Sequence, residues 1–443
     1  MIDEYRLVVL GMGYVGLTLA AVNAKVGFSV VGVDPNEVII SQLKKHNPHF
    51  HENGLVELLK EVEDSLEFVT EIPATKSNEN SIFVIAVGTS LTTNGDADYC
   101  QLDSAIEDIA KVIKSGDVVV LRSTVIAGTT NQRVIPMLEK LTGFTVGNEI
   151  FVGFAPERTI EGKAIEELRT LPQVVAASSS AGTRIISDFF SKVSQEVITV
   201  DTLESAEMVK LISNSYRDLT FAFSNSIALA ASKHNVDVYE LITAANQNYE
   251  RNHIPLPSPG VGGYCLTKDP YLYAQGCSEN KDIMNLMHAG RIINSAMPKH
   301  VADIADSFIR HLGISDVTVV VVGLAFKSSP PTSDVRFSPS IELVKELQNA
   351  GIDDIYAYDP HVLSNVYTEH GIKEIEQFED AITCGDIIVF MHGDQMYADK
   401  NVLDVLRKRK GEQLLIDTWG LFAGKIKSSV HGVDYANLSY KTF

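Results

Sequence analysis

The architecture of the chain follows from one segment near its start, Leu7-Val8-Val9-Leu10-Gly11-Met12-Gly13-Tyr14-Val15-Gly16. The first four residues are apolar and predict a buried strand, and the apolar run 17–22 predicts a helix. Between them the glycines stand in the pattern Gly-x-Gly-x-x-Gly. Such glycines make a tight turn, admit a pyrophosphate and let the helix pack on the strand, while the first helical amides hold the phosphate charge. The segment therefore predicts a dinucleotide-binding βαβ unit.

A carboxylate further along indicates which dinucleotide this turn would bind. The second strand-like run, 30–33, ends at Asp34, about 20 residues after the glycines. A carboxylate at that place accepts hydrogen bonds from the ribose hydroxyls and repels a 2′-phosphate. We therefore predict NAD rather than NADP as the cofactor. The predicted contacts in this unit are Gly11, Gly13, Tyr14, Val15, Gly16 and Asp34.

The alternation of strand and helix continues after this unit. Buried parallel strands that end in small polar residues build a doubly wound sheet with its ligand at that edge. Thr89 and Thr124 follow two such strands and are therefore expected to contact cofactor or substrate, although threonine at a strand end also caps helices. The strand-like runs are 82–87, 118–121 and 151–154.

Charged residues stand at the end of the last of these strands and on the long helix predicted after it. Glu157 and Arg158 stand at the strand tip, where they either serve the site or form a salt bridge with each other. Helical spacing then runs over about 205–235 and again over about 271–312. On the first helix Lys210, Asn214 and Arg217 lie at i, i+4 and i+7, which makes one face. This face is either a solvated stripe or a donor cluster for a carbonyl oxygen or phosphate.

The segment between the helices is rich in glycine and carries a cysteine, Pro259-Gly260-Val261-Gly262-Gly263-Tyr264-Cys265-Leu266-Thr267-Lys268-Asp269-Pro270. Glycines permit backbone conformations closed to other residues and allow a ligand to approach closely. A thiol forms covalent intermediates readily near neutral pH, so Cys265 is a candidate nucleophile. The alternative is a glycine-rich turn that holds a small apolar cysteine.

After residue 312 the strand–helix pattern returns, and its second strand ends at Asp359-Pro360 just as the earlier one ends at Asp34-Pro35. This half lacks Gly-x-Gly-x-x-Gly and offers Lys327, Asp334 and Arg336, which suits a different nucleotide whose phosphates meet side-chain cations. We predict an α/β fold with two Rossmann-like doubly wound parallel-sheet domains, joined by a central helical domain with a long helix. The expected limits are 1–200, 201–300 and 301–443.

Composition narrows the class of protein. The formal charge is 37 minus 57, or −20, which argues against nucleic-acid binding. Apolar runs are too short to span a bilayer and the N-terminus lacks the basic region of a signal peptide. Four scattered cysteines suit neither a disulfide framework nor a zinc cluster, so we expect a reducing cytoplasm and no metal. Cys277 and Cys384 are interpreted as packing residues.

Taken in order, these motifs resemble the UDP-glucose/GDP-mannose dehydrogenase family along essentially the whole chain. The resemblance implies NAD in the N-terminal domain, a homodimer supported by the long helix, and a UDP-sugar held largely by the C-terminal domain. The implied reaction oxidises the C6 alcohol of the sugar to a carboxylate and consumes two NAD and one water. The motifs are Pro156-Glu157-Arg158, Lys210 with Asn214, Gly262-Gly263-x-Cys265-x-x-Lys268-Asp269, Gly323-Leu324-Ala325-Phe326-Lys327 and Asp334-x-Arg336-x-Ser338-Pro339.

The resemblance also implies roles for individual residues. Cys265 attacks the aldehyde to give a thiohemiacetal, whose oxidation yields a thioester that water hydrolyses. Lys210 and Asn214 stabilise the oxyanion, and Glu157 assists hydrolysis. Asp269 and Thr124 organise water and proton transfer. Further NAD contacts are expected from Thr89, Thr124, Lys268 and Arg336, and substrate contacts from Glu157, Arg158, Lys210, Asn214, Arg217, Arg251, Gly262 and Lys327.

Two segments, 214–218 and 259–263, resemble the branch of the family that acts on UDP-N-acetylhexosamines, in glycan precursor synthesis. Arg251 resembles an arginine that reaches the substrate, in one reading the substrate of the partner subunit, and the alternative is an exposed loop cation. No residue distinguishes UDP-GlcNAc from UDP-ManNAc. The sequence departs from the usual family pattern at Ser90, at Tyr264 and at 417–420.

Three other functions remain open at this point. The first is oxidation of UDP-glucose or GDP-mannose. The second is a two-electron hydroxyacid dehydrogenase, which leaves Cys265 and the second sheet without a role. The third is a non-catalytic NAD-binding sensor, in which Cys265, Lys210 and Asn214 are dispensable.

Overall fold

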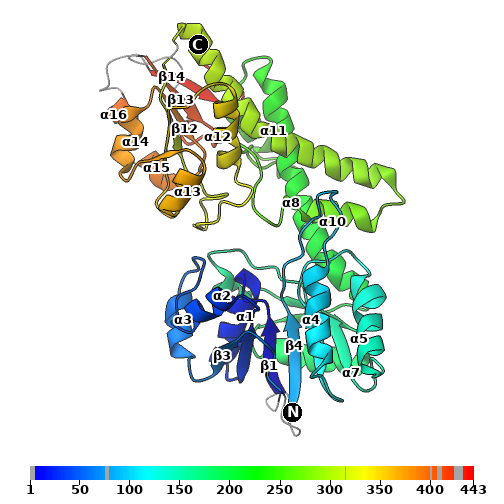
Figure 1. The fold of residues 1–443 in the computed structure, drawn as a ribbon. Helices are drawn as coiled ribbons and strands as arrows, with labels where there is room; N and C mark the ends of the chain where they lie inside the picture. The colour runs from blue at the N-terminus through cyan, green and yellow to red at the C-terminus, as the bar shows by residue number, and fades with distance from the viewer. Residues whose placement is uncertain (1–4, 75–78, 315, 400–401, 407–411, 424–432) are drawn as a thin grey trace. The chain divides into compact units, whose positions relative to one another are not determined.

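The computed structural model describes residues 5–74, 79–314, 316–399, 402–406, 412–423 and 433–443. The chain forms two compact units, Met1–Asn214 with Tyr271–Met284 and Ser215–Pro270 with Asn285–Phe443. Each unit is built on one largely parallel sheet with helices packed on it (Figure 1). The predicted class, two parallel-sheet α/β parts with a helical region in the middle of the chain, is confirmed.

Among the described residues, the first sheet has eight strands in the order β3-β2-β1-β4-β5-β6-β7-β8. Neighbouring strands run parallel except β6 and β7, which are antiparallel. This order carries the strands outward from β1 in both directions, as in doubly wound folds. The strands are β1 (Tyr5–Leu10), β2 (Val30–Val33), β3 (Leu66–Val69), β4 (Asn80–Ile85), β5 (Val118–Leu121), β6 (Phe151–Phe154), β7 (Gln173–Ala177) and β8 (Val197–Thr199).

Helices cover both faces of this sheet, which explains why its central strands are apolar at every position. Successive side chains of a strand point to opposite faces. Leu7 and Val9 of β1 pack in the core with α1 and α3, while Val8 and Leu10 pack in the core with α4 and α5. The helices are α1 (Tyr14–Lys25), α2 (Glu37–Leu43), α3 (Leu55–Glu61), α4 (Cys100–Ala110), the π-helix η2 (Thr130–Val134), α5 (Ile135–Thr142), α6 (Ala164–Thr170) and α7 (Ser180–Ser191).

The middle of the chain is helical. The first predicted helix is confirmed as α8 (Leu203–Ser232) and is followed by α9 (Val238–Asn246). The second predicted helical stretch, over about 271–312, is confirmed as helical, but it is divided at 277–280 into two helices, α10 (Asp269–Gly276) and α11 (Lys281–Leu312). The break has a local cause. The Asn280 side chain accepts hydrogen bonds from the amides of residues 282 and 283, which is how an N-cap begins a new helix.

The second sheet has six strands among the described residues, in the order β11-β10-β9-β12-β13-β14, and all paired neighbours run parallel. Its strands are β9 (Val319–Val322), β10 (Ile355–Tyr358), β11 (Lys373–Glu374), β12 (Ile387–Phe390), β13 (Gln413–Asp417) and β14 (Val433–Asn437). Its helices are α12 (Pro339–Asn349), α13 (Ser364–Glu369), α14 (Phe378–Cys384), α15 (Gln395–Asp399) and α16 (Val402–Leu406).

In both sheets, an aspartate directly after the second strand along the chain accepts hydrogen bonds from the turn after the first strand. Asp34 Oδ2 accepts a hydrogen bond from the Met12 amide at 2.9 Å. In the second sheet Asp359 Oδ2 accepts from the amides of Leu324 and Ala325 at 2.8 and 3.0 Å. In both sheets a carboxylate therefore holds the turn that follows the first strand.

The segment 417–420, which departs from the family pattern, lies at the end of β13, with Asp417 and Thr418 buried and the next two residues half-buried. Asp417 is fully buried, and burial raises the pKa of its carboxyl although three backbone amides and the Tyr435 hydroxyl donate to it. The Trp419 indole donates to the Met391 carbonyl at 2.8 Å, and its ring lies against Gly393.

Two further expectations concern cysteines and membranes. The interpretation of Cys384 as a packing residue is wrong, because its side chain is exposed at the end of α14, whereas Cys277 is half-buried. Within the described ranges, every helix is too short or too polar to cross a membrane.

Candidate active site

The turn after β1 has the backbone that its glycines predict. Gly11 has a φ of +92°, and a Cβ there would lie 2.8 Å from the Ala86 carbonyl oxygen. A Cβ at Gly16 would lie 1.8 Å from the Gly11 oxygen, so α1 and β1 meet only because both residues lack a side chain. At Gly13 a Cβ would meet nothing within 4 Å. Open space therefore faces the start of α1, and this fits the approach of a pyrophosphate.

The predicted ribose ligand lies beside this turn. Asp34 Oδ2 accepts from Met12 and Oδ1 accepts from the Asn36 amide at 3.0 Å. A carboxylate has about four acceptor positions, so two remain beyond these bonds. Tyr14 stacks on Phe50 with ring centroids 3.9 Å apart, which fixes the first residue of α1. Gly11, Gly13, Tyr14, Val15, Gly16 and Asp34 therefore lie together as the sequence predicts.

Thr89 and Thr124 join the loops after β4 and β5. The Thr89 hydroxyl donates to the Thr124 carbonyl at 2.5 Å and is buried, while Thr124 is half-buried. The Ser123 hydroxyl donates to the Val87 carbonyl at 2.6 Å and links the same two loops. The side chain of Thr89 thus holds a loop in place, and that of Thr124 stays partly accessible.

The first unit contains a buried ion pair between Glu157 and Arg122. Glu157 is 5% exposed and pairs with Arg122, which is 2% exposed, at 2.6 Å between Nη2 and Oε2. Burial by itself raises the pKa of Glu157, but Arg122, the Thr159 amide and Lys210 together hold this pKa below its ordinary value. Glu157 is therefore an ionised carboxylate in a nearly dry environment.

This pair corrects one of the sequence interpretations. Glu157 does not form an ion pair with its neighbour Arg158. The Arg158 guanidinium is exposed and donates only weakly to the Pro172 carbonyl at 3.5 Å, although the Arg158 backbone amide donates to Glu157 Oε1 at 2.6 Å. The partner is Arg122, a residue that the sequence reasoning missed. Its signal was an arginine directly after the four apolar residues of β5, because a charge at that place needs a partner.

Lys210 and Asn214 lie on the buried side of α8, 8% and 7% exposed, so the interpretation of both as a solvated stripe is wrong. The charge of Lys210 contributes to the low pKa of Glu157, which relates these two side chains electrostatically. Arg217 is exposed instead.

In the second unit the glycines press the cysteine loop against its neighbours. A Cβ at Gly262 would lie 2.4 Å from the Phe337 carbonyl oxygen. Gly263 has a φ of +82°, and a Cβ there would lie 2.7 Å from the ring of Phe326. The loop is held closely on this side, yet the Cys265 side chain is exposed. An accessible thiol on a firmly packed loop differs from a cysteine that fills a core.

Charged and aromatic side chains gather around this loop. Lys268 and Asp269 form a buried ion pair of 2.8 Å. Nζ of Lys268 lies 5.3 Å and Cζ of Arg336 lies 5.1 Å from the ring centroid of Tyr264, both within cation–π range. Arg336 is also held by Asp334, with 2.6 Å between Nη2 and Oδ2. Lys268, its partner Asp269 and Arg336 therefore lie around Tyr264, the residue that precedes Cys265.

The turn after β9 differs from the one after β1. Gly323 has a φ of +95°, and a Cβ there would lie 2.2 Å from His392 Cγ. The His392 ring is buried and its Nε2 lies 2.8 Å from the Ala325 carbonyl. Lys327 stands half-buried with Nζ 5.6 Å from the Phe326 ring centroid.

The remaining substrate residue, Arg251, is exposed after α9, with its guanidinium 4.8 Å from the Tyr249 ring centroid. The structure thus groups the predicted residues in two sets. Thr124, Glu157, Arg158, Lys210 and Asn214 belong to the first unit, and Arg217, Arg251, Gly262, Cys265, Lys268, Asp269, Lys327 and Arg336 belong to the second.

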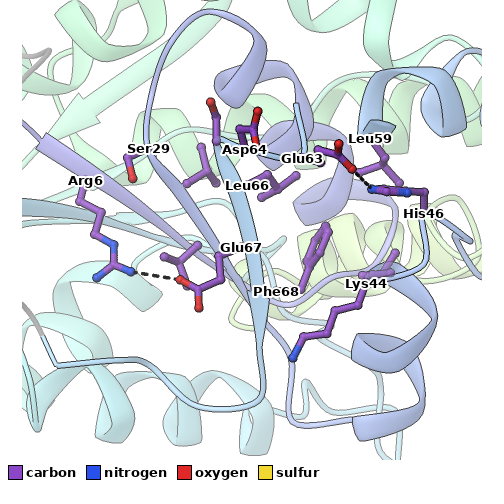
Figure 2. A pocket seen from close by; sticks show the side chains of 14 residues that line it. Arg6, Ser29, Lys44, His46, Leu59, Glu63, Asp64, Leu66, Glu67 and Phe68 are labelled. Carbon is purple, nitrogen blue, oxygen red and sulfur yellow. Dashed lines mark ion pairs between the residues drawn. The ribbon is translucent and has the colours of Figure 1, made fainter. Parts of the chain in front are cut away.

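A hollow of about 550 Å³ lies elsewhere, at the amino ends of β2 and β3 (Figure 2). Ion pairs flank it, Arg6 with Glu67 at 3.8 Å and His46 with Glu63 at 3.3 Å. In parallel sheets of this kind ligands bind at the carboxyl ends of the strands. None of the residues that the sequence nominates lines this hollow, so we do not assign the chemistry to it.

Three successive parts of the sequence match domains of one family. Residues 5–202 match the NAD binding domain of the UDP-glucose/GDP-mannose dehydrogenase family, residues 204–296 its central domain and residues 320–424 its UDP binding domain.

Individual relatives match over nearly the whole chain. A UDP-N-acetyl-D-mannosamine dehydrogenase of Pyrococcus horikoshii is 32% identical over 85% of this chain and 88% of its own. A UDP-N-acetyl-D-glucosamine 6-dehydrogenase of Salmonella typhi is 28% identical over 94% and 96%. The solved structure of a UDP-D-ManNAc dehydrogenase from Pyrococcus horikoshii has a TM-score of 0.85 at 29% identity and covers 98% of this chain and 99% of its own.

Proposed function

The chain belongs to the UDP-glucose/GDP-mannose dehydrogenase family, and on that premise we propose that it oxidises the C6 hydroxyl of a UDP-N-acetylhexosamine to the carboxylate. It is an NAD-dependent oxidoreductase with an NAD-binding domain. The observation that carries the covalent route is the exposed Cys265 thiol on a loop that glycines press against its surroundings. We retain three domains, 1–200, 201–300 and 301–443, as a proposal.

NAD, when bound, accepts the hydride that leaves C6 in each of the two oxidations. The turn at Gly11, Gly13 and Gly16 would hold its pyrophosphate, and Asp34 its ribose. Lys268 and Arg336, both fixed by carboxylates, would meet its remaining charge. The half-buried Thr124 and the packed loop at Thr89 would border the nicotinamide end of the site.

Cys265 carries the covalent chemistry in this proposal. Its thiolate adds to the C6 aldehyde carbon, and the oxygen of the resulting thiohemiacetal is the alcohol that is oxidised next to give a thioester. Water then adds to the thioester carbonyl, the carbon–sulfur bond breaks, and the carboxylate leaves while the thiol is restored. The covalent thiohemiacetal retains the intermediate at the aldehyde level, so free aldehyde is not released.

Four residues of the first unit, together with Asp269 of the second, would stabilise charge and hold water. Lys210 and Asn214 donate to the C6 oxygen as negative charge develops on it. Their burial supports this role, because a donor in a dry environment acts more strongly than one in water. The ionised Glu157 accepts a proton from the attacking water, with Thr124 and the buried Asp269 holding water in place.

Binding of the UDP-sugar would use the cations of the second unit. Lys327, which stands beside Phe326, is a candidate for the UDP phosphates, and Gly262 would allow the sugar to approach the backbone. Arg217 and Arg251, which are exposed, and Arg158 of the first unit are further candidates. We propose that Arg251 reaches the substrate of a partner subunit. The product would supply a glycan or polysaccharide precursor.

Assembly as a homodimer is supported by one face of α8. Met208, Ile212, Tyr216 and Phe223 are 37%, 47%, 68% and 58% exposed, and their spacing places them on one side of the helix. An exposed apolar stripe of this length is typical of a surface that another chain covers. We keep a reducing cytoplasm as the proposed location.

The deciding measurement is the number of NADH formed per nucleotide sugar consumed, with UDP-GlcNAc, UDP-ManNAc, UDP-glucose and GDP-mannose as the panel. We expect two NADH and a carboxylate product with one of the two UDP-N-acetylhexosamines. Cys265→Ala should abolish the carboxylate product, whereas Cys384→Ala, which removes another exposed thiol, should retain it. One NADH per sugar, or turnover only of the UDP-glucose or GDP-mannose, would contradict the proposal.

A further inference from the structure

Two buried charged side chains of the second unit hold the segment that precedes Cys265. Arg291 of α11 is 4% exposed, and Asp218 of α8 is fully buried. Their ion pair measures 2.6 Å between Nη1 and Oδ1. The same guanidinium also donates to the Val261 carbonyl, at 3.4 Å from Nη1 and 3.3 Å from Nη2. The carbonyl belongs to the loop that continues as Gly262-Gly263-Tyr264-Cys265.

Two asparagines extend this contact to a second point of the loop. Asn294 donates to Asp218 Oδ1 at 2.8 Å and to its backbone oxygen at 2.9 Å. Asn225 donates to Asn294 Oδ1 at 2.9 Å and accepts from the Ser258 amide at 2.8 Å. The loop is therefore held at Ser258 and at Val261 by one buried polar network.

The helices meet closely at this place because of a glycine. A Cβ at Gly290 would lie 2.8 Å from a Leu219 methyl group and 3.8 Å from Asp218 Oδ2. Gly290 precedes Arg291 directly, so the close approach of α11 to α8 is what brings the guanidinium to the carboxylate. Within the described chain, Asp218 Oδ2 has no hydrogen-bond partner, so this pair is not optimised as a carboxylate–guanidinium fork.

A buried ion pair contributes little stability by itself, because desolvation of the two charges offsets their attraction. Apolar residues of similar volume would pack α8 against α11 as well or better. What an apolar pair lacks is a rigid donor aimed at a loop carbonyl. Arg291 supplies this donor, and Asp218 holds its Nη1 through the contact with Oδ1.

We propose that Asp218 and Arg291 are positioning residues that fix the Val261 carbonyl and thereby set the orientation of Cys265 for its attack. The inference rests on the proposed function in that Cys265 is taken to be the nucleophile. Neither residue touches the reacting atoms; they act through the loop backbone.

The test compares Arg291→Met, which keeps length and apolar volume, with the nearly isosteric Asp218→Asn and with Arg291→Lys. Lys299→Met is the matched control, since Lys299 lies on the same helix and forms an exposed ion pair with Asp303 at 2.9 Å. The first readout is amide hydrogen exchange of residues 258–268, which needs no enzyme activity. The second is kcat and KM for NAD and for the UDP-sugar.

We expect Arg291→Met and Asp218→Asn to speed exchange of the loop amides by about tenfold or more. We also expect kcat to fall by about 10- to 100-fold while both KM values stay within about threefold of the wild type, because a small misplacement of a nucleophile slows chemistry more than binding. Arg291→Lys should be intermediate and Lys299→Met unchanged. If Arg291→Met does not fold, Asp218→Asn decides the question alone.

Unchanged loop exchange in the folded variants would overturn the proposal, as would a loss that lies in KM alone. Failure of the proposed function has a different signature. In that case Cys265→Ala still forms full product, which refutes a catalytic role for the loop. Faster loop exchange in Arg291→Met would then still show that the ion pair holds the loop in place.

Discussion

Asp34 combines two tasks in one side chain, since it holds the glycine turn through the Met12 amide and is the proposed ribose ligand. We predict that Asp34→Asn lowers kcat/KM for NAD by about 10- to 100-fold, because a charge-assisted hydrogen bond contributes about 1.5–3 kcal/mol. The ratio of NADP to NAD use should rise. Steady-state rates with both cofactors test this.

Asp359→Asn is the matched control for that experiment, because Asp359 occupies the same place in the second sheet. It should leave the ratio of NADP to NAD use unchanged. An equal change in both variants would mean that the effect is a general loss of turn structure.

Glu157 offers a prediction about pH. Loss of one partner of a buried ion pair costs about 3–5 kcal/mol, since the other charge stays buried, so Glu157→Gln should destabilise the first unit by about this much at neutral pH. Its pKa is lower in the folded chain than in the unfolded one, so the stabilisation is fully present above the ordinary carboxyl pKa and is lost as the pH falls through the folded value. Urea unfolding followed by circular dichroism measures it.

The difference between wild type and Glu157→Gln should therefore shrink on acidification. Asp108→Asn, which breaks the exposed pair with Lys111, is the control and should leave the unfolding midpoint unchanged at every pH. A difference that stays constant down to strongly acidic pH would contradict the assignment of Glu157 as an ionised group.

At the scale of elements, two glycines at the junction of β1 and α1 have different predicted roles, one in stability and the other in NAD binding. Gly16→Ala places a methyl group 1.8 Å from the Gly11 oxygen, so the helix must move and we expect a loss of at least about 1–3 kcal/mol together with loss of NAD binding. Gly13→Ala meets nothing within 4 Å and should change stability by less than about 0.5 kcal/mol. It should still weaken NAD binding by tenfold or more, because its methyl group occupies the approach of the pyrophosphate.

Thermal unfolding and NAD titration of the two glycine variants test this separation. Equal losses of stability, or undiminished NAD affinity in Gly13→Ala, would contradict it.

The sequence predicts the central strands well, because a sheet covered on both faces requires uninterrupted apolar runs such as Val118–Leu121. It predicts the edges poorly. In β3 the residues alternate between buried and exposed, and β11 consists of two exposed residues, so neither has such a run. The antiparallel pairing of β6 with β7 leaves no local signal either.

The candidate site residues also divide into those that the sequence predicts and those that it does not. Residues tied to local patterns, such as Gly11 and Cys265, are recognisable from the chain alone. Arg122 is marked by its place directly after an apolar strand, but its partner is not recognisable, because the partner depends on which strand tips are adjacent, and β5 and β6 are neighbours in space. Asp218 and Arg291 are separated by 73 residues, beyond the reach of any helical spacing.

For the whole molecule, the exposed stripe of α8 predicts how chains assemble. Ile212→Glu places a charge among the apolar side chains and should weaken the proposed homodimer by about 100-fold or more, since a buried unpaired charge is strongly unfavourable. Sedimentation over a concentration series measures this. Leu141→Glu is the control, because Leu141 is 48% exposed on α5 and is not part of the α8 stripe, so it should leave the assembly unchanged. A wild-type chain that sediments as a monomer at all concentrations would refute the homodimer.

The setting of Trp419 gives the protein an optical reporter. The chain has one tryptophan, and its indole is hydrogen-bonded within the second sheet and packed on Gly393. Fluorescence excited selectively at the tryptophan therefore follows the melting of this half alone, whereas far-ultraviolet dichroism follows both halves. Curves that coincide would mean that the two halves melt as one cooperative unit, and curves that separate would assign each transition to its half without any label.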